Sequence, residues 1–505
     1  MSPKANIDDL KIIGFFSSKI ISGIGFLLFI PAIISFILKE WNPCINLVLG
    51  GCISLIVGFL LMIFCRTSKA PTWTQGLAAV AFSWILAMFL SAIPYYLSGV
   101  MGSYLDACFD IMSGFTTTGL YLMKDLDHIP YGLNFYRHFL SFLCGQGIVI
   151  VALSFMVGGT GGMFKLYVGE GREEKILPNV VQTSRAIWII SLSYLAIGTT
   201  FITIIELFDG LSFWKALYHG TCLFMGAWST GGFLPQSQNI VYYHNYWIEG
   251  AVTVFSILGS LNFALHYAVW EGQRKEIFKN IEIRSFVATL LLTFFILILG
   301  LVQAKTYPGF FVNFRRAFFI IISGHTGTGN MSVYSVQFIK EWGPMAMLGI
   351  IMAMSIGACA CSTCGGFKSL RVGIVCKSLL QEIRRYISPE SSIITQKFHH
   401  IREYILDNSL VKNAMMIILL YMATYFIGAI FGMYYGYPAI EAFFESVSAG
   451  SNTGLSCGIT TSAMPSLLKI VYIVQMWVGR LEFISVLTLL GVLFNFFMSK
   501  KQRVN

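Results

Sequence analysis

Long apolar runs separated by short polar stretches dominate the chain from about residue 12 to residue 497. The first two runs span residues 12–38 and 45–65, and each is long enough for a transmembrane helix, which needs about 20 apolar residues. The first run is too long for a signal-peptide core and lacks a small-residue cleavage site, so we expect it to remain as a span. The pattern predicts an all-α polytopic membrane protein.

After these two runs the sequence repeats one plan four times: a long apolar run, a shorter amphipathic run, a turn rich in Gly, Ser and Thr, and a second long apolar run. Aligned on a final glycine, every turn places a threonine directly before it. The pairs are Thr118 and Gly119, Thr230 and Gly231, Thr328 and Gly329, and Thr453 and Gly454. We therefore expect two N-terminal transmembrane helices in residues 1–70 and pore repeats in residues 71–160, 161–272, 273–390 and 391–505.

The repeat plan also predicts a topology. Each unit crosses the membrane, re-enters partway and crosses back, so that all four units have the same orientation. Parallel repeats are related by an axis along the membrane normal, which lets the four turns meet on the outer side around one central pathway. That is the arrangement of an ion pore.

Composition narrows the class further. The 505 residues are 56% hydrophobic and only 11% charged, whereas soluble domains carry about 25% charged residues. The excess of 34 Lys and Arg over 24 Asp and Glu lies at the N-terminus and in the polar stretches between runs, on the inner side if the N-terminus is cytoplasmic. The net charge of +10 therefore indicates membrane orientation, and we expect no nucleic-acid partner.

The four turns carry the candidate chemistry. Non-helical backbone at membrane depth is tolerated only where it is buried in protein or lines water. Glycine takes positive φ at no steric cost, so successive carbonyl oxygens can point at the axis and replace the hydration shell of a monovalent cation. The turns contain no Asp or Glu, which favours K⁺ over a divalent ion. The alternative is that the small residues only let helices pack closely.

The turns resemble the selectivity-filter segments of the Trk/Ktr/HKT superfamily of K⁺ transporters, and the two leading spans favour its bacterial TrkH branch. The resemblance covers residues 10 to 500 and implies one filter glycine per repeat, with ion ligands largely from main-chain oxygens just before it. The implied K⁺ site residues are Thr117, Thr118, Gly119, Ser229, Thr230, Gly231, Gly327, Thr328, Gly329, Asn452, Thr453 and Gly454. Gly327 and His325 make the third turn unusual.

Acidic residues precede the turns in two repeats only. Asp110 lies nine residues before the glycine of repeat 1, and Glu445 nine residues before that of repeat 4. We expect these two carboxylates to support the filter by accepting backbone hydrogen bonds. The alternatives are attraction of cations, or an acid satisfied by its neighbours in the pore wall.

The second apolar run of each repeat reaches a comparable depth in the membrane 26 to 29 residues beyond the turn, and in repeat 4 this position holds a charged residue. Arg480 stands about halfway along its predicted span, residues 467–497, where an arginine is costly unless it faces water or a partner. A guanidinium in the pathway would repel K⁺ and set a barrier, and the superfamily has an arginine here in the same Gly-Arg-Leu-Glu context. The alternative is a buried ion pair with Glu482 or another acid, and the spacing of two residues disfavours Glu482.

Repeat 3 is interrupted at the same depth by a run of small residues. Such a run does not pack as a transmembrane helix, and the superfamily uses a mobile intramembrane loop here as a gate. The predicted gate residues besides Arg480 are Gly357, Ala358, Cys359, Ala360, Cys361, Ser362, Thr363, Cys364, Gly365, Gly366 and Lys368. A metal site at Cys359, Cys361 and Cys364 is the alternative, although their spacing is not a usual zinc pattern.

The sequence thus predicts K⁺ uptake across the bacterial cytoplasmic membrane, with K⁺ as the transported ion and no covalently bound cofactor. The resemblance implies a homodimer, with a cytosolic nucleotide-binding regulatory ring of the TrkA kind on the cytoplasmic face and membrane lipid around it. A Na⁺- or H⁺-coupled K⁺ symporter of the same superfamily is the first alternative. A polytopic membrane enzyme that uses cysteines or histidines is the second, but the sequence has no HExxH motif, no Gly-x-Ser-x-Gly motif and no intramembrane acids paired at catalytic spacing.

Overall fold

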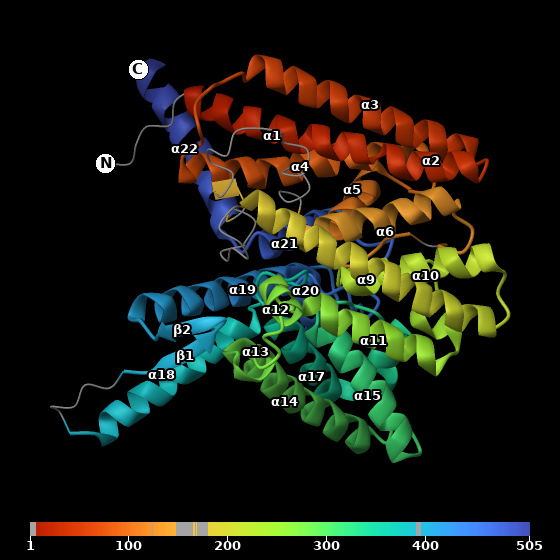
Figure 1. Ribbon diagram of the computed structural model, residues 1–505, viewed down its shortest axis with the longest axis vertical. Coiled ribbons are helices and arrows are strands. Elements are labelled where there is room, and N and C mark those ends of the chain that lie inside the picture. The colour runs from red at the N-terminus through yellow and green to blue at the C-terminus, as the bar shows by residue number, and fades with distance from the viewer. Residues whose placement is uncertain are drawn as a thin grey trace.

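The computed structural model describes residues 7–123, 125–147, 165, 166, 168, 180–389 and 395–504. The chain is built almost entirely of helices, as the sequence predicts, and the boundary expected between repeats 1 and 2 lies outside the described residues. Two N-terminal spans come first. They comprise α1 (Ile7–Leu27) with its short continuation α2 (Phe29–Ile37), and α3 (Trp41–Phe64). α1 packs between α3 and the first helix of repeat 1 (Figure 1).

Each repeat then contributes a long outer helix, a short pore helix and a second helix. In repeat 1 these are α4 (Trp73–Leu97), α5 (Tyr104–Phe115) and α6 (Tyr131–Gln146). In repeat 2 they are α9 (Val180–Phe208), α10 (Phe213–Trp228) and the pair α11 (Tyr246–Ser260) and α12 (Phe263–Trp270), with the 3₁₀ turn η1 (Asn239–Tyr243) between α10 and α11.

The second half of the chain follows the same order. In repeat 3 the helices are α14 (Ile281–Ala304), α15 (Phe310–His325) and α17 (Gly343–Ile356), with the short α16 (Ser335–Gln337) and the π-helical turn η2 (Phe338–Trp342) before α17. In repeat 4 they are α19 (Asn408–Tyr434), α20 (Ala439–Gly450) and the pair α21 (Ser466–Arg480) and α22 (Ile484–Val504). The four-residue α13 (Glu276–Lys279) leads into α14.

The second helices are not the continuous spans that the sequence suggested. α11 and α12 meet at a bend of 98°, and α21 and α22 meet at a bend of 112° directly after Arg480. α6 and α17, with 16 and 14 residues, reach about 24 Å and 21 Å at 1.5 Å per residue, short of a bilayer core of about 30 Å. In the described chain, six helices are long and apolar enough to span a membrane, or eight if each bent pair is one span. Helix breaks at one depth are therefore common to the repeats rather than confined to repeat 3.

The repeats close into a ring. The pore helix of each repeat packs against the second helix of its neighbour, in the pairs α6 with α10, α11 with α15, α17 with α20, and α21 with α5. The C-terminal ends of the pore helices, which lead into the turns, are buried, while the long helices α3, α14 and α19 expose large apolar side chains outward. A ring of buried short helices inside a shell of apolar helices is the arrangement that the repeat pattern predicts.

The polar stretch between repeats 3 and 4 contains a helix and a β-hairpin. α18 (Ser369–Ile387) is helical, but residues 397–405 form an antiparallel hairpin of β1 (Lys397–His400) and β2 (Arg402–Ile405). Phe398 of β1 stacks on Tyr404 of β2 and is buried against Ile281 and Ile374. The hairpin lies on the side of the molecule where α22 ends (Figure 1).

Candidate functional site

Each pore helix ends in a tight turn with the same backbone shape. One residue in each turn takes a positive φ: Thr117 (54°), Thr230 (48°), Gly327 (71°) and Asn452 (55°). Positive φ is uncommon for non-glycine residues and is strained for a β-branched one such as threonine. Three non-glycine side chains held in this conformation, all of them buried, indicate that the surrounding structure dictates the path of the main chain.

A second positive φ follows two residues later and corrects one predicted residue. It falls on Gly119 (87°), Gly329 (78°) and Gly454 (93°), but in repeat 2 on Gly232 (60°) rather than Gly231. The backbone agrees, because Gly231 N donates to Gly226 O over 3.0 Å just as Thr118 N donates to Ser113 O over 2.8 Å. Alignment on the Thr-Gly pair was therefore wrong by one residue in repeat 2.

The corrected register also changes which residues of repeat 2 correspond to the predicted ion ligands. Thr230 and Gly231 occupy the positions held in repeat 1 by Thr117 and Thr118, and Ser229 corresponds to Thr116. The sequence holds a signal for this register, since Gly231 and Gly232 are adjacent and the apolar Phe233 then aligns with Leu120.

The four glycines form a closed ring. A methyl group at Gly119 would lie 2.6 Å from Gly231 O, one at Gly232 2.1 Å from Thr328 O, one at Gly329 2.0 Å from Thr453 O, and one at Gly454 2.0 Å from Thr118 O. Each glycine therefore packs directly on the main-chain carbonyl of the next repeat, and the fourth returns to the first. No other residue type fits, both for lack of space and because of the positive φ.

Side-chain hydroxyls brace the turns from behind. Thr116 Oγ1 and Thr118 Oγ1 lie 2.7 Å apart, and the matching pairs are Thr326 with Thr328 at 2.8 Å and Ser451 with Thr453 at 2.7 Å. Repeat 2 has Gly231 at the second position, so Ser229 Oγ pairs instead with Ser141 Oγ of α6 at 3.0 Å.

The unusual third turn has a simple structural explanation. Gly327 occupies the position where the other three turns force a non-glycine residue into positive φ, so it adopts the common conformation without strain. His325 lies behind the turn, where Nε2 contacts Thr289 Oγ1 of α14 at 2.9 Å and the ring packs on Phe286. The third turn thus follows the same path as the others.

The two acids before the turns contact the backbone just beyond the ring. Asp110 Oδ1 accepts from Leu122 N over 2.8 Å, three residues past Gly119. Glu445 accepts from Cys457 N, three residues past Gly454, over 3.0 Å. Glu445 also accepts from Thr460 N over 2.9 Å and Ser456 Oγ over 2.7 Å. The corresponding position in repeats 2 and 3 holds Leu223 and Ile320.

A small cavity opens beyond the ring. It measures about 150 Å³ and reaches Gly119, Gly329 and Gly454 together with the loop around Thr460. The main-chain ring therefore has a space large enough for several water molecules directly on one side of it.

On the other side of the ring lies the α17–α18 loop, residues 357–368. It is not helical, as predicted from its small residues. Thr363 is its innermost residue: its Oγ1 donates to Gly259 O over 2.8 Å and lies 3.0 Å from Thr230 Oγ1, while its main-chain oxygen accepts from Thr117 Oγ1 over 3.1 Å. The loop thus touches the turns of repeats 1 and 2 directly.

Further contacts of the same loop reach the other two turns. A methyl group at Gly365 would lie 2.1 Å from Ser451 O, and one at Gly357 would lie 2.2 Å from Gly365 O, so small residues are required for this packing. Cys364 lies against Gly327. Lys368 Nζ donates back to Cys364 O, which ties the end of the loop to its middle. The other predicted gate residues lie in the same loop: Ala358, Cys359, Ala360, Cys361, Ser362 and Gly366.

Arg480 lies at the end of α21, at the same level as the loop, and is 8% exposed. Its guanidinium donates to Thr363 O, to Cys144 O over 3.2 Å and to Gly145 O over 3.4 Å. The predicted alternative of an ion pair with Glu482 is wrong, because Glu482 pairs with Arg371 at the start of α18. Arg480 therefore connects repeats 1, 3 and 4 beneath the ring.

The three loop cysteines do not form a metal centre. Among the residues that the structure describes, no group of three or more His, Cys, Asp or Glu side chains could hold a metal ion. Cys364 Sγ instead lies 3.1 Å from Ser362 Oγ, and all three cysteines are free thiols. Small size accounts for these residues, as the loop packing requires.

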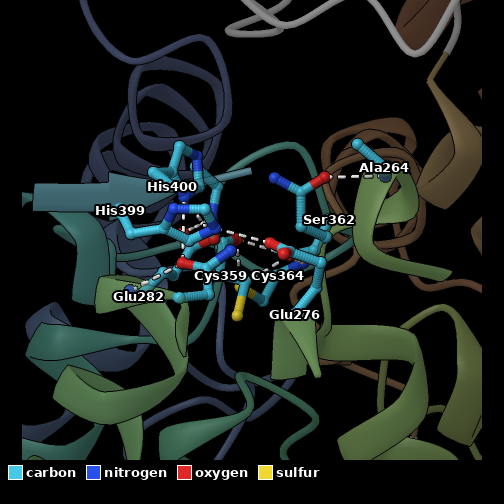
Figure 2. A network of polar contacts seen from close by, with 11 residues as sticks. Ala264, Glu276, Glu282, Cys359, Ser362, Cys364, His399 and His400 are labelled. Atoms are coloured by element: carbon cyan, nitrogen blue, oxygen red, sulfur yellow. Dashed lines mark hydrogen bonds and ion pairs between the residues drawn. The ribbon is translucent and has the colours of Figure 1, made fainter. Parts of the chain in front are cut away.

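Sequence reasoning missed Glu282, which holds the loop from the side. Its side chain is fully buried and accepts from Ala360 N, while His400 of β1 lies 4.0 Å from its second oxygen and 3.0 Å from Asn280 Oδ1. Figure 2 shows this network, in which β1 and the start of α14 meet the α17–α18 loop. No local motif marks Glu282, because its partners are more than 70 residues away in sequence.

Comparisons with known proteins agree with this architecture. The profile of the TrkH family, described as a cation transport protein, matches residues 44–498. A protein described as an uncharacterized cation transporter of Methanocaldococcus jannaschii is 30% identical over 477 residues, covering 94% of each chain. The Trk system potassium uptake protein TrkG of Escherichia coli is 28% identical, covering 83% of this chain and 85% of its own.

A solved structure shares the fold. The potassium transporter TrkH from Vibrio parahaemolyticus superposes with a TM-score of 0.79 at 22% identity, covering 95% of this chain and 98% of its own. Together with the four turns, the closed ring of glycines and the loop beneath it, these matches show that the chain belongs to the TrkH family of cation transport proteins.

Proposed function

We propose that this multi-pass membrane protein conducts K⁺ through the ring formed by the four turns. The observation that supports this most is the packing of the four ring glycines. Each one lies against the main-chain carbonyl of the residue just before the ring glycine of the next repeat, and the four contacts close into a ring. Because a glycine without Cβ lets neighbouring main chains approach, four sets of main-chain oxygens converge on one axis. The relatives named as potassium uptake proteins support K⁺ as the ion.

The proposed ligands are main-chain oxygens, two from each repeat. They belong to Thr117 and Thr118, Thr230 and Gly231, Gly327 and Thr328, and Asn452 and Thr453, with Gly119, Gly232, Gly329 and Gly454 shaping the ring. Neutral carbonyls suit a weakly hydrated monovalent cation, since a divalent ion would lose far more hydration energy than they return. K⁺ is the cargo here, and the hydroxyl pairs behind the turns would fix the diameter of the ring.

The α17–α18 loop and Arg480 are the proposed gate. The loop lies against the turns, so a hydrated ion leaving the ring would have to displace it, and the positive charge of Arg480 would oppose an ion at the same level. The hydrogen bond from Arg480 to Thr363 O would couple the two elements. Asp110 and Glu445 are proposed to hold the backbone beyond the ring in place.

We propose the cytoplasmic membrane with the N-terminus, the hairpin and α18 on the cytoplasmic side, because the basic residues gather in these segments. A homodimer and a nucleotide-binding regulatory ring of the TrkA kind are proposed from the family resemblance. Membership of a cation transport family argues against the membrane-enzyme alternative.

Rescue of growth in a K⁺-uptake-deficient bacterium at low K⁺, followed by Rb⁺ and Na⁺ flux into liposomes, tests the proposal. Growth and Rb⁺ flux without Na⁺ flux would support a K⁺ pathway. Rb⁺ flux that requires a Na⁺ or H⁺ gradient would establish the coupled alternative, and a folded protein inactive in both assays would refute both.

A further inference from the structure

A pocket of about 450 Å³ lies away from the ring, where β1 meets the start of α14 and the middle of α18. Its polar lining is dominated by cations. They are Lys279, Arg284, Lys377 and Lys397, joined by His399 and a single acid, Glu403. Ile281 and Phe398 form the apolar floor. So many basic side chains facing one hollow repel one another unless an anion lies between them.

The protein supplies little negative charge to this pocket. Glu403 is engaged by His399, whose Nδ1 lies 2.9 Å from it, while Nε2 lies 2.6 Å from Glu276. The Glu276 carboxylate, with help from Glu403, raises the pKa of His399, which adds to the positive charge. Within the part of the chain that the structure describes, the two acids contact this histidine, and Lys279, Arg284, Lys377 and Lys397 form no ion pair.

Two of the cations are also held in position by the backbone. Lys377 Nζ donates to Lys397 O over 2.9 Å, which joins α18 to β1. Arg284 Nε donates to Phe278 O over 2.8 Å, which leaves its two terminal amino groups for a ligand. A guanidinium and an ammonium fixed in this way lose little freedom when they bind an anion, and they match the oxygens of a phosphate.

We propose that this α14–β1 pocket is a binding site for a phosphate group, carried either by an anionic lipid headgroup or by a soluble phosphate compound. A phosphate offers three strong acceptor oxygens and up to two negative charges, which matches the unpaired cations. Basic pockets beside membrane helices on one face of a membrane protein commonly take such groups.

Occupancy of the pocket would reach the α17–α18 loop. Arg284 and Ile281 flank Glu282 on α14, and Glu282 holds Ala360 N of the loop. An anion that clamps β1 onto α14 would therefore strengthen the support of the loop. This second step rests on the proposed function, whereas the binding step does not.

Binding is tested with the full-length protein in neutral detergent. Thermal stability is titrated with inorganic phosphate at constant ionic strength, with phosphatidylglycerol in mixed micelles, and with phosphatidylcholine as the zwitterionic comparison. We expect a saturable rise in Tm with phosphatidylglycerol, with inorganic phosphate, or with both. A response to the lipid alone would assign the source to the membrane. A response to inorganic phosphate alone would assign it to a soluble compound, and a response to both would show a phosphate site open to either source.

The pocket variant is Lys279→Gln with Lys377→Gln, and the matched control is Arg274→Gln with Lys275→Gln, an exposed basic pair in the turn before α13. Each lost ammonium should weaken apparent affinity about tenfold in the pocket variant, with wild-type affinity in the control. Equal loss in both would show general electrostatic attraction and overturn the proposal, as would a non-saturable response in the wild type.

Lys397→Gln, at the exposed rim, repeats the test if the double variant does not fold. A liposome flux change on adding phosphatidylglycerol tests the link to the loop separately, and inactive protein that still binds would refute only the flux step.

Discussion

The guanidinium of Arg480 donates to the main-chain oxygen of Thr363, which joins the end of α21 to the centre of the α17–α18 loop. The same guanidinium reaches the last turn of α6 through Cys144 O and Gly145 O. In the proposed gate, the charge of Arg480 and the loop are therefore expected to act as a single barrier.

Replacing Arg480 therefore tests both components of that barrier. Arg480→Ala removes the charge and the bond to the loop. We expect K⁺ flux into liposomes to rise at least tenfold, since a unit charge a few ångströms from the ion contributes a few kcal/mol at an effective dielectric of about 20 and about 1.4 kcal/mol already corresponds to a factor of ten. Arg480→Lys keeps the charge but loses most of the hydrogen bonds, so its flux should lie between that of the wild type and that of Arg480→Ala. Flux in Arg480→Ala equal to that of the wild type would show that the arginine is not in the ion's path.

The corrected register in repeat 2 predicts different outcomes for two adjacent glycines. Gly232→Ala forces a side chain at positive φ to within 2.1 Å of Thr328 O, so we expect lost K⁺ selectivity or failure to fold. Gly231→Ala meets Ser141 Oγ at 2.0 Å, a side chain that can rotate away, so we expect folded protein with a milder effect. Thermal stability and the K⁺ to Na⁺ flux ratio of both variants measure this. A larger effect of Gly231→Ala than of Gly232→Ala would instead support the alignment on the Thr-Gly pair.

Glu445 should support the backbone beyond the ring more strongly than Asp110 does. Glu445 accepts four hydrogen bonds from the 456–460 segment, two of them from main-chain N–H groups, whereas Asp110 accepts one from Leu122 N. Glu445→Gln should therefore lower the K⁺ to Na⁺ flux ratio and the stability more than Asp110→Asn does, by about 1–3 kcal/mol in unfolding free energy. Unchanged selectivity and stability in both variants would limit these acids to a passive place in the wall.

Glu282 is predicted to keep the α17–α18 loop in place. Glu282→Ala leaves Ala360 N without its partner and should release the loop, raising basal flux and the rate at which Cys359, Cys361 and Cys364 react with a thiol reagent. These thiols are 0%, 9% and 1% exposed, so site-resolved mass spectrometry should detect the change clearly. Glu271→Gln, an exposed acid on the turn before α13, is the control and should leave the labelling unchanged. Equal labelling of Glu282→Ala and wild type would remove Glu282 from the loop's support.

The attachment of the hairpin should depend on pH. The pKa of His399 is raised, chiefly by the hydrogen bond to Glu276, so the folded state favours the protonated ring. The stabilisation is therefore complete below pH about 6.5, the ordinary pKa of histidine, and is lost as the pH rises through the higher folded-state value. Amide hydrogen exchange of residues 397–405, corrected for its intrinsic pH dependence, should show falling protection across that window in the wild type. His399→Gln should show no such change, and a persisting pH step in that variant would assign it to another group.

The fold was predictable from the sequence because membrane insertion imposes long apolar runs, and because a fourfold repeat exposes its own register. The same repeat explains the one error among the ring glycines. Repeat 2 has Gly231 where the others have threonine, and a Thr-Gly pair one residue earlier than the structural position misled the alignment. Only the backbone conformation distinguishes these two glycines.

Contacts between residues far apart in the sequence could not be predicted from hydropathy or repeat spacing. Glu282 meets Ala360 across 78 positions, and Arg371 takes Glu482 across 111, so no spacing rule could pair them. The bends after Arg480 and Ser260 were also hidden, because their flanking runs are apolar on both sides and read as continuous spans. Hydropathy reports burial in lipid or protein, but it does not report where a helix turns.

The central claim is a K⁺-selective path through the ring of main-chain oxygens. The most direct test is the reversal potential of purified protein in a planar bilayer, with K⁺ and Na⁺ gradients set independently and with Arg480→Ala used to raise the current. We predict that the reversal potential follows the K⁺ gradient and does not move when the Na⁺ gradient is changed. A potential that follows Na⁺ equally, or a flux that exists only with an imposed Na⁺ or H⁺ gradient, would contradict it.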